Sequence, residues 1–397
     1  MANQNKLTEA YLPERSARKE KVAIALSGGI DSLVSAYLLK IQKYDLVALT
    51  VVPSWDELGK DQDQVLSCAV SEKSLTELQE HCQQMGIPQV LIRITGEFKE
   101  RVVERWRSRR ALGEKADQCW DCHGLRMELL HEKMKEIGAT KLATGHFAKV
   151  FRGDAEGSCF VQCSNDETHD QSGLLSRLPQ EILQDLMLPL SDLQKKETAK
   201  LAENFGISGK GASVEMFGCF PESEELTRIL AATLPPRFRK EGLICDAEDD
   251  RLEDHEGVYA FTRGEEILSE DKSSKLFFGH YVPTEKKIVA VPESWFARTS
   301  VFLRECAVPA DTPWGRPFRG VLVRDHQAYE GWFFPKSLSS CLVELDAPAE
   351  LVEGEILTVM RRKGKNARVL LTGSVCYLAE EKEEGEKNAV IDFARDF

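Results

Sequence analysis

The sequence predicts an α/β protein with an N-terminal parallel-sheet domain, a small central domain and a C-terminal β-barrel. Short apolar runs alternate with helical patterns over the first 212 residues, a glycine-rich stretch follows, and short alternating apolar segments fill the chain from residue 286. Alternating strands and helices favour a parallel sheet covered on both faces. Closely spaced strands separated by turn residues favour a barrel or sandwich. We therefore predict domains at 1–212, 213–285 and 286–397.

The elements of the first domain follow from its apolar runs. Strands are expected at 22–26, 46–52, 89–94 and 140–145, and helices at 31–43, 72–86, 99–110 and 123–138. Ligands in such folds bind beyond the carboxyl ends of the strands. Two motifs fall at such ends, SGGIDS at 27–32 and TGH at 144–146. We expect both motifs to line one ligand site.

The remaining elements are short. The stretch GISGKGA at 206–212 is expected to lead into the small central domain. The β segments that follow are KIVAV, SVFLREC, GVLVRD, EGWFF, SSCLVELD, EILTVMRR and ARVLLTGSVCYL. Turn residues separate these segments, which is the pattern of a compact barrel.

Composition limits the class of protein. Of 397 residues, 42% are hydrophobic and 29% are charged, and no apolar run reaches the roughly 18 to 20 residues of a membrane span. The N-terminus lacks the apolar segment of a secretory signal. The eleven cysteines are dispersed over a long chain, which favours reduced thiols over a disulfide framework. We expect a cytoplasmic protein without a membrane partner.

The net charge of −13, from 52 basic and 65 acidic residues, gives no long-range attraction to nucleic acid. A nucleic-acid partner would need a local basic surface. The segment KERVVERWRSRR at 99–110 supplies one, and Arg105 and Arg109 are its candidate contacts. The alternative interpretation is a solvated helix face.

The glycine turn SGGIDS has the residues of an anion-binding loop. Gly28 and Gly29 allow the backbone to approach an anion closely, and Ser27 and Ser32 can donate hydrogen bonds beside the start of the next helix. Asp31 is expected to bind a magnesium ion or to orient the loop. The spacing is neither that of a Walker loop nor GxGxxG. An ordinary strand-to-helix turn would use similar residues.

In that position SGGIDS resembles the S-G-G-x-D-S loop of N-type ATP pyrophosphatases (PP-loop enzymes), which split ATP between its α and β phosphates. Further segments narrow the resemblance to the tRNA-specific 2-thiouridylases. They are GEKADQCWDC, ATGHFAKV, HDQSGLL, PLSDLQKKETAKLAENFGI, CF at 219–220 and DHEGVYAFTRG. The resemblance implies an ATP- and Mg²⁺-dependent sulfurtransferase that replaces the O2 of a tRNA uridine with sulfur.

The resemblance also assigns residues. The ATP contacts would be Ala25, Leu26, Ser27, Gly28, Gly29, Ile30, Asp31, Ser32, Val52 and Gly145. Cys122 would lie beside the target base, and Cys219 would carry a persulfide. His169 and Gln171 would contact tRNA, and Asp170 between them would orient the reacting groups. The sequence departs from the family pattern at 115–118, at the residues after Cys122, and at 264–266.

Three interpretations of the cysteines remain open. Cys119, Cys122 and Cys219 could hold a [4Fe–4S] cluster with one iron left open for sulfide. Cys122 and Cys219 could instead form a persulfide relay that ends in a transient disulfide. The third interpretation is a zinc site or two thiols without a chemical role, and His123 or His146 is then the candidate fourth zinc ligand.

The partners implied are tRNA and a sulfur donor, either a persulfide carrier protein or sulfide. The C-terminal barrel is expected to grip the tRNA body. Two other functions stay open from the sequence. One is a PP-loop adenylating enzyme that acts on another substrate. The other is a catalytically diverged paralogue that binds nucleotide or RNA without turnover.

Overall fold

The computed structural model describes most of the chain. The described residues are 20–56, 66, 72–116, 118–153, 158–207, 224–267, 275–309, 312–324, 327–364 and 367–377. Within them no helix is long and apolar enough to span a membrane. They form a parallel α/β domain, a five-stranded central sheet and a closed barrel, so the predicted fold class is confirmed.

The α/β domain is built on one parallel sheet with the strand order β3-β2-β1-β4-β7. Its strands are β1 Lys21–Ala25, β2 Asp45–Pro53, β3 Gln89–Ile94, β4 Lys141–Ala143 and β7 Leu186–Met187. All neighbouring pairs are parallel. The strand order reverses at β1, which pairs with β2 on one side and β4 on the other. Ligands of open α/β sheets bind at such a reversal, and both predicted motifs follow these strands.

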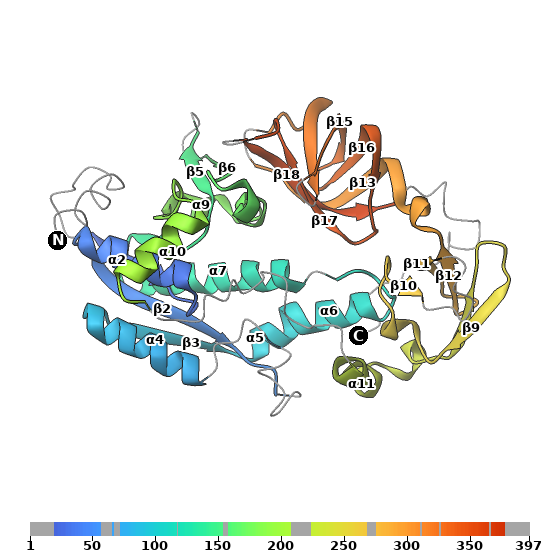
Figure 1. Cartoon of the computed structure of the whole chain (residues 1–397), viewed down its shortest axis with the longest axis horizontal. Coiled ribbons are helices and arrows are strands. Elements are labelled where there is room, and N and C mark those ends of the chain that lie inside the picture. The colour runs from blue at the N-terminus through green and yellow to red at the C-terminus, as the bar shows by residue number, and fades with distance from the viewer. Residues whose placement is uncertain are drawn as a thin grey trace.

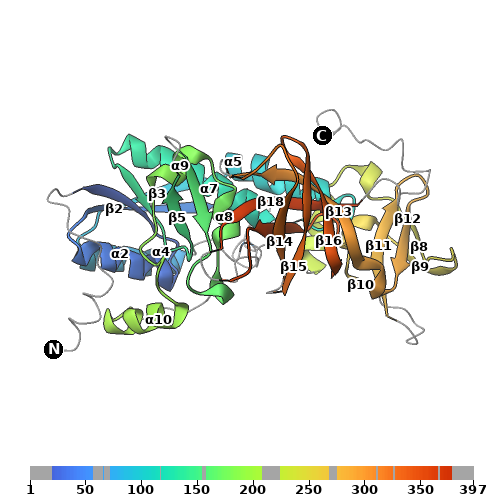
Figure 2. The same ribbon diagram turned by 90° about the horizontal axis from the view of Figure 1, so that it is seen from above.

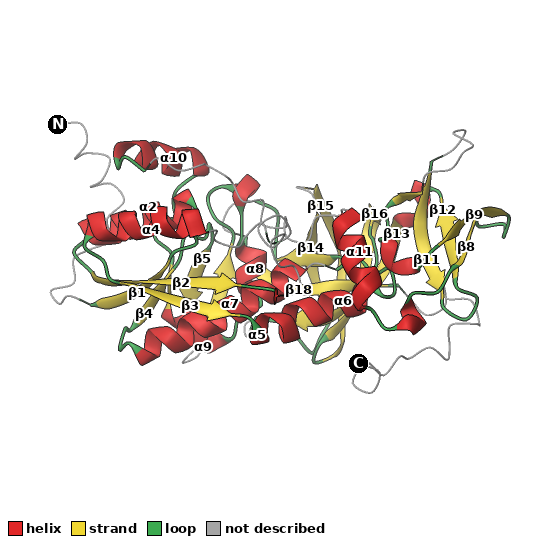
Figure 3. Cartoon of the chain, turned by 90° about the horizontal axis from the view of Figure 1, so that it is seen from below, coloured by secondary structure: helices red, strands yellow, loops and turns green. Residues whose placement is uncertain are grey.

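Helices cover both faces of this sheet (Figures 1 and 3). The helices α2 Ile30–Ile41, α4 Glu72–Met85 and α10 Lys195–Asn204 lie on one face, and α7 Gln118–Glu136 and α9 Gln180–Asp185 lie on the other. Leu38, Leu78 and Leu201 belong to one apolar cluster, and Leu125 and Ile182 belong to the second. The strands are buried between these clusters, which explains their continuous apolar runs.

Two predicted helices differ in detail from the structure. The basic segment is helical as α5 Gly96–Phe98, a π-helical turn η2 Lys99–Val103, and α6 Glu104–Arg110. The helix expected at 123–138 begins earlier, at Gln118, as α7. The C-x-x-C motif therefore lies on the first turns of a helix, and its two cysteines share one side because they are three residues apart.

The central sheet has the order β10-β11-β12-β8-β9. Its strands are β8 Gly242–Cys245, β9 Arg251–His255, β10 Glu266–Ile267, β11 Leu276–Val282 and β12 Lys287–Val291, and helix α11 Glu224–Thr233 precedes them. We assigned 287–291 to the C-terminal domain, and that assignment is wrong. The segment pairs with β8 and β11. The alternation of apolar residues at 287–291 predicts a strand. It does not indicate which sheet the strand joins.

The C-terminal strands close into the expected barrel, in the order β13-β16-β15-β14-β17-β18. They are β13 Ala297–Ala307, β14 Phe318–Arg324, β15 Gln327–Ser337, β16 Ser340–Glu350, β17 Ile356–Met360 and β18 Val369–Cys376. Alternate side chains such as Val301, Phe333, Val343 and Leu371 fill its interior. Closure leaves no unpaired strand edge.

The barrel lies between the α/β domain and the central sheet (Figure 2). On the α/β side it contacts α8 Ser172–Ser176 and the hairpin of β5 Lys149–Arg152 and β6 Cys159–Gln162. Ser176 Oγ lies 2.7 Å from Thr372 Oγ1, and the Cys163 N–H donates to the Ala367 carbonyl at 2.9 Å. These hydrogen bonds fix the barrel against the elements that carry the predicted tRNA contacts.

Candidate active site

The glycine turn joins the end of β1 to the start of α2 and is braced by its own side chains. Ser32 Oγ donates to the Gly29 carbonyl at 2.8 Å, and the Gly29 N–H donates to Ser27 Oγ at 3.3 Å. Gly28 has a φ of 83°, which L-residues rarely adopt. No side chain caps the N-terminus of α2. The positive end of that helix is therefore available to an anion.

The TGH segment at the end of β4 packs directly on this turn. A Cβ placed on Gly145 would lie 2.7 Å from the Ser32 backbone nitrogen and 2.8 Å from the Asp31 carbonyl carbon. Only glycine allows this approach. The structure thus brings together two motifs that are more than 110 residues apart, as the sheet topology predicts.

The other predicted ATP contacts lie on the first two strands. Ala25 pairs with Leu49 of β2, and the Leu26 N–H donates to the Leu49 carbonyl at 2.9 Å. Val52 lies further along β2, is 7% exposed and packs against Leu75 of α4. Val52 is therefore the penultimate residue of the strand next to the one that carries the glycine turn. Its contact with adenosine stays a prediction.

Asp31 forms an ion pair with Lys195, the first residue of α10. The Lys195 backbone N–H donates to Asp166 Oδ2 at 2.8 Å, and its ammonium group lies 5.7 Å from the centre of the Phe147 ring. Lys195 is therefore a half-buried residue at the phosphate turn and not a solvated one. No spacing in the sequence indicates a contact across 164 residues.

The second carboxylate oxygen of Asp31, Oδ1, is buried and has no hydrogen-bond partner among the described residues. A buried anionic oxygen without a partner is costly. A hard cation such as Mg²⁺ prefers carboxylate oxygen ligands and would satisfy it. The residues present therefore fit the predicted magnesium contact of Asp31.

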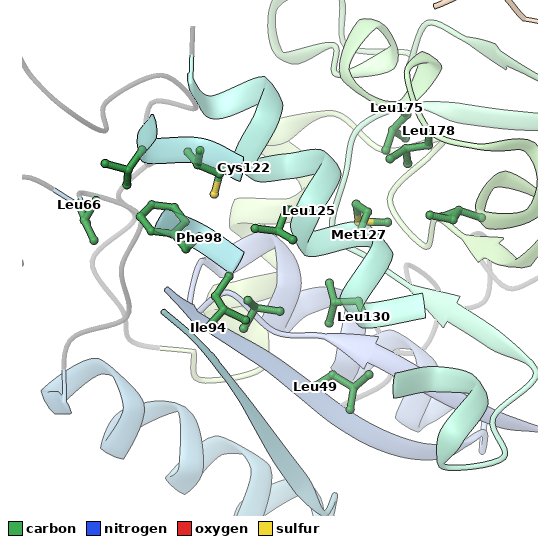
Figure 4. Packing of buried hydrophobic residues seen from close by; sticks show 14 of the residues in the cluster. Leu49, Leu66, Ile94, Phe98, Cys122, Leu125, Met127, Leu130, Leu175 and Leu178 are labelled. Carbon is green, nitrogen blue, oxygen red and sulfur yellow. The ribbon is translucent and has the colours of Figure 1, made fainter. Parts of the chain in front are cut away.

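Cys122 lies on α7 and is 7% exposed within the apolar cluster of the second sheet face. Figure 4 shows it on the side of the helix that carries Leu125, close to Phe98. Cys119 is half-buried and packs against the same cluster. The helix thus holds the two thiols of the C-x-x-C motif on one face, with Cys122 the more deeply buried.

Cys219 lies outside the described residues, so its distance from Cys122 is not part of the structure. The nine cysteines within the described ranges are all free thiols. Those ranges contain no group of three side chains that could hold a metal ion. The persulfide pair and the three-cysteine cluster both stay predictions.

Two histidines connect the cysteine helix to the phosphate turn. His123 of α7 and His146 of the TGH segment contact edge to face, with ring centres 5.1 Å apart. Thr144 Oγ1 lies 2.8 Å from His146 Nδ1, whereas His123 Nε2 is buried without a partner in the described part of the chain. Burial lowers the pKa of His146 to about 4 and also lowers the pKa of His123. Both rings are neutral at pH 7.

The segment with the predicted tRNA contacts is a tight turn. Asp170 accepts hydrogen bonds from the Ser164 N–H at 2.6 Å and from Ser172, and burial raises the pKa of its carboxyl group. Gln171 Oε1 accepts from the Phe147 N–H at 3.0 Å. His169 is exposed and lies 3.1 Å from Asp166 Oδ1. Asp170 and Gln171 therefore fix the turn beside the TGH segment, and His169 faces solvent.

A cleft of about 750 Å³ separates this turn from the barrel. One wall contains Asp170, Gln171 and Trp120, and the other comes from β14, β15, β17 and the residues that follow β17. Both walls carry polar and apolar side chains. The cleft therefore lies between the predicted RNA contacts and the barrel.

Arg105 and Arg109 of α6 are engaged with acidic residues. Arg105 Nε lies 3.2 Å from Asp121 Oδ2 of α7. Both arginines pair with Glu305 of β13, at 3.3 Å for Arg109. These arginines therefore link α6 to the cysteine helix and to the barrel. Their contact with tRNA stays a prediction.

Comparison with known proteins identifies the family. The sequence profile described as "tRNA methyl transferase HUP domain" matches residues 20–220. The tRNA-specific 2-thiouridylase MnmA of Bradyrhizobium diazoefficiens is 30% identical over 287 residues, which are 72% of this chain and 72% of that protein. The chain belongs to the tRNA-specific 2-thiouridylase family.

Further family members agree with this result. The tRNA-specific 2-thiouridylase MnmA of Nitrobacter winogradskyi is 31% identical over 246 residues, or 62% of this chain and 60% of that protein. Among solved structures, the U34-tRNA thiolase NcsA of Methanococcus maripaludis covers 58% of this chain and 70% of its own, at 17% identity and a TM-score of 0.33.

Proposed function

We propose that this protein is an ATP-dependent tRNA sulfurtransferase that forms 2-thiouridine. Family membership supports this function, because the 2-thiouridylase of Bradyrhizobium diazoefficiens aligns with 72% of the chain. The proposal places the protein in the cytoplasm, where tRNA and ATP are available.

The observation that carries the proposal is the contact between the two halves of the site. The helix that follows the phosphate turn, α2, and the thiol helix α7 lie on different faces of the sheet, and His123 of α7 meets His146 of the TGH segment, which packs on the turn. An enzyme that activates a base with ATP and then delivers sulfur needs both groups at one place.

In the proposed reaction, the uridine O2 attacks the α-phosphorus of ATP and pyrophosphate leaves. The turn from Ser27 to Ser32 and Gly145 would hold the phosphates, and Asp31 would bind Mg²⁺, which offsets phosphate charge. The terminal sulfur of a Cys219 persulfide then attacks C2, and the C2–O2 bond breaks with departure of AMP. The Cys122 thiolate attacks the Cys219 sulfur and releases the other sulfur to the base. The resulting disulfide is reset by an external thiol.

The sulfur donor is either a persulfide carrier protein or sulfide. If the donor is sulfide, Cys119, Cys122 and Cys219 would instead ligate a [4Fe–4S] cluster. The positions of Cys119 and Cys122, three residues apart on α7, agree with this alternative. An anaerobic iron and sulfide assay of the purified chain, with Cys119→Ala beside it, distinguishes the two routes.

The two other functions considered from the sequence are less well supported. A PP-loop enzyme that adenylates another substrate needs no cysteine helix beside its phosphate turn. A paralogue that binds without turnover would not need the close approach of Gly145 to the turn or the Asp31–Lys195 ion pair, and this chain has both.

Methyl transfer is named in the description of the family profile. That reaction uses a donor that is already activated, so it needs no ATP phosphate site.

The direct test measures AMP and pyrophosphate release with and without unmodified tRNA, together with nucleoside mass spectrometry of the RNA. We expect release of AMP to require tRNA and 2-thiouridine to appear in equal amount. AMP release that proceeds equally without RNA, and with no thiolated base, would contradict the proposed function.

A further inference from the structure

A second pocket, separate from the cleft, lies on the barrel. Its volume is about 320 Å³. Its lining consists of four arginines and two apolar residues: Arg316, Arg319, Arg361, Arg368, Pro313 and Leu370. Among the described residues, no carboxylate belongs to this lining. In a chain with a net charge of −13, a concave surface lined by four guanidinium groups is unusual.

The charge of this arginine pocket is only partly neutralised. Arg319 pairs with Asp346 through both terminal nitrogens, at 2.8 and 2.6 Å, and with Glu330 at 3.1 Å. Arg316 and Arg361 have no acidic partner within the described residues and are exposed. Like charges held close together are unfavourable without an anion. The planar guanidinium group pairs with phosphate through two parallel hydrogen bonds.

Aromatic side chains flank the arginine pocket on both sides. The Arg319 guanidinium lies 5.7 Å from the centre of the Trp332 ring, and Trp332 is 44% exposed. The Arg368 guanidinium lies 3.4 Å from the Phe160 ring of β6, which stacks on Phe151. Phe151 is 42% exposed. Arginines interleaved with exposed aromatic rings are typical of surfaces that bind RNA backbone and unpaired bases.

The arginine pocket also borders the cleft. Arg361 follows Met360, which lines the cleft with Lys363 and Gly364. Arg368 is anchored on β6, the strand that leads to Cys163 at the other wall. The chain therefore passes from the lining of the cleft to the lining of the arginine pocket between Met360 and Arg361.

We propose that the arginine pocket binds a backbone phosphate of the substrate RNA next to the nucleotide held in the cleft. The inference rests on the proposed function, since it takes tRNA as the substrate. It assigns the RNA contact to Arg316 and Arg361, because their charges have no acidic partner within the described ranges. The pocket anchors the RNA backbone, while the cleft holds the base.

The test measures binding of the full chain to an unmodified tRNA transcript between about 50 and 200 mM salt. The variant R316Q/R361Q removes the two unpaired charges, and R316K/R361K keeps them. The matched control, R251Q/K275Q, removes two exposed cations of the central sheet that pair with Asp254 and Glu266. Thermal unfolding of each variant checks that the fold is kept.

We expect R316Q/R361Q to weaken tRNA binding roughly tenfold and to make the salt dependence shallower by about one or two logarithmic units per decade of salt. The lysine variant should keep most of the salt dependence, and the control should match the wild-type chain. Equal binding by R316Q/R361Q and wild type would overturn the inference, as would an equal loss in the control.

Two further results separate this inference from the proposed function. If the wild-type chain thiolates tRNA and R316Q/R361Q binds tRNA unchanged, the pocket assignment is wrong and the function stands. If the wild-type chain neither binds nor thiolates tRNA, both are wrong. Inorganic phosphate is titrated in parallel by thermal shift. A phosphate-induced shift that disappears in R316Q/R361Q while tRNA binding is unchanged would overturn the inference, because the pocket then takes only the free anion.

Discussion

The two halves of the candidate site differ in how they are built. The phosphate half is polar, with a glycine turn held by serine hydroxyls and an uncapped helix start. The cysteine half is part of the apolar core, where Cys122 packs near Phe98 and Leu125. The phosphate half leaves the start of α2 open, whereas the cysteine half leaves only 7% of Cys122 exposed to solvent. Five predictions test this comparison.

The largest effect is expected from Cys122→Ser on the cysteine half. We expect 2-thiouridine formation to fall by at least about 10³-fold, because the hydroxyl group cannot replace a reacting thiol. ATP binding should be unchanged, since the phosphate half is separate. Nucleoside mass spectrometry and ATP titration measure the two effects. Cys376→Ser, on the barrel, is the control, and an unchanged thiolation rate in Cys122→Ser would exclude the assigned role.

Gly145→Ala should weaken ATP binding by the phosphate half and leave the cysteine half unchanged. The new Cβ would lie 2.7 Å from the Ser32 nitrogen. Such overpacking costs about 1–3 kcal/mol. If the turn is displaced to relieve it, the same free energy corresponds to a roughly 5- to 150-fold loss of ATP affinity. Isothermal titration with a non-hydrolysable ATP analogue measures it. Gly96→Ala, where nothing lies within 4 Å of the added Cβ, is the matched control. Equal ATP affinity in both variants would show that the close approach is not needed.

Lys195→Gln tests a cation of the phosphate half that the sequence did not assign. We expect the KM for ATP to rise roughly tenfold, because a charged hydrogen-bonding group beside Asp31 is lost. Lys196→Gln removes an exposed charge from the next position of the same helix and should have no effect. Steady-state kinetics compare the two variants. A similar KM for ATP in both would show that Lys195 does not contribute to ATP binding.

The histidine contact between the halves predicts a loss of stability in acid. The pKa of His146 is lowered to about 4 in the folded chain, against about 6.5 when unfolded. Below pH 6.5 the unfolded chain takes up a proton that the folded chain does not, so stability falls from pH 6.5 towards pH 4.

His146→Gln removes this titration and can keep the hydrogen bond to Thr144. The decrease in Tm between pH 7 and pH 5 should therefore be smaller by about 2–4 °C than in the wild-type chain. His169→Gln, at an exposed position, should leave the decrease unchanged. Parallel decreases in His146→Gln and wild type would contradict the buried, neutral state.

The smallest effect is expected at Glu305, which joins the cysteine half to the barrel. The Arg105–Glu305 pair is about half exposed, so Glu305→Gln should cost about 1 kcal/mol or less in stability. Arg109 loses its partner Glu305, whereas Arg105 keeps Asp121. The cation that becomes available should steepen the salt dependence of tRNA binding by about one unit. Binding that weakens, or does not change, would show that these arginines act only between the domains.

Several features of the site were predictable because they depend on local chemistry. The glycine turn needs residues that tolerate a φ of 83°, as Gly28 does, and the TGH motif follows a buried strand. Parallel strands place their carboxyl ends at one edge, so the meeting of both motifs followed from the strand pattern. The closed barrel followed from the short alternating segments.

The contacts of Lys195, His123 and Glu305 were not predictable. Each depends on two segments far apart in the chain, and a single sequence carries no signal for such pairs. The same reason explains the misassigned strand at 287–291, whose apolar alternation fits either neighbouring sheet. The sequence by itself thus determined the elements, the phosphate turn and the family, because these depend on residue type and short spacing. Only the tertiary structure decided which charges are paired and which remain available, because pairing depends on distances that packing sets.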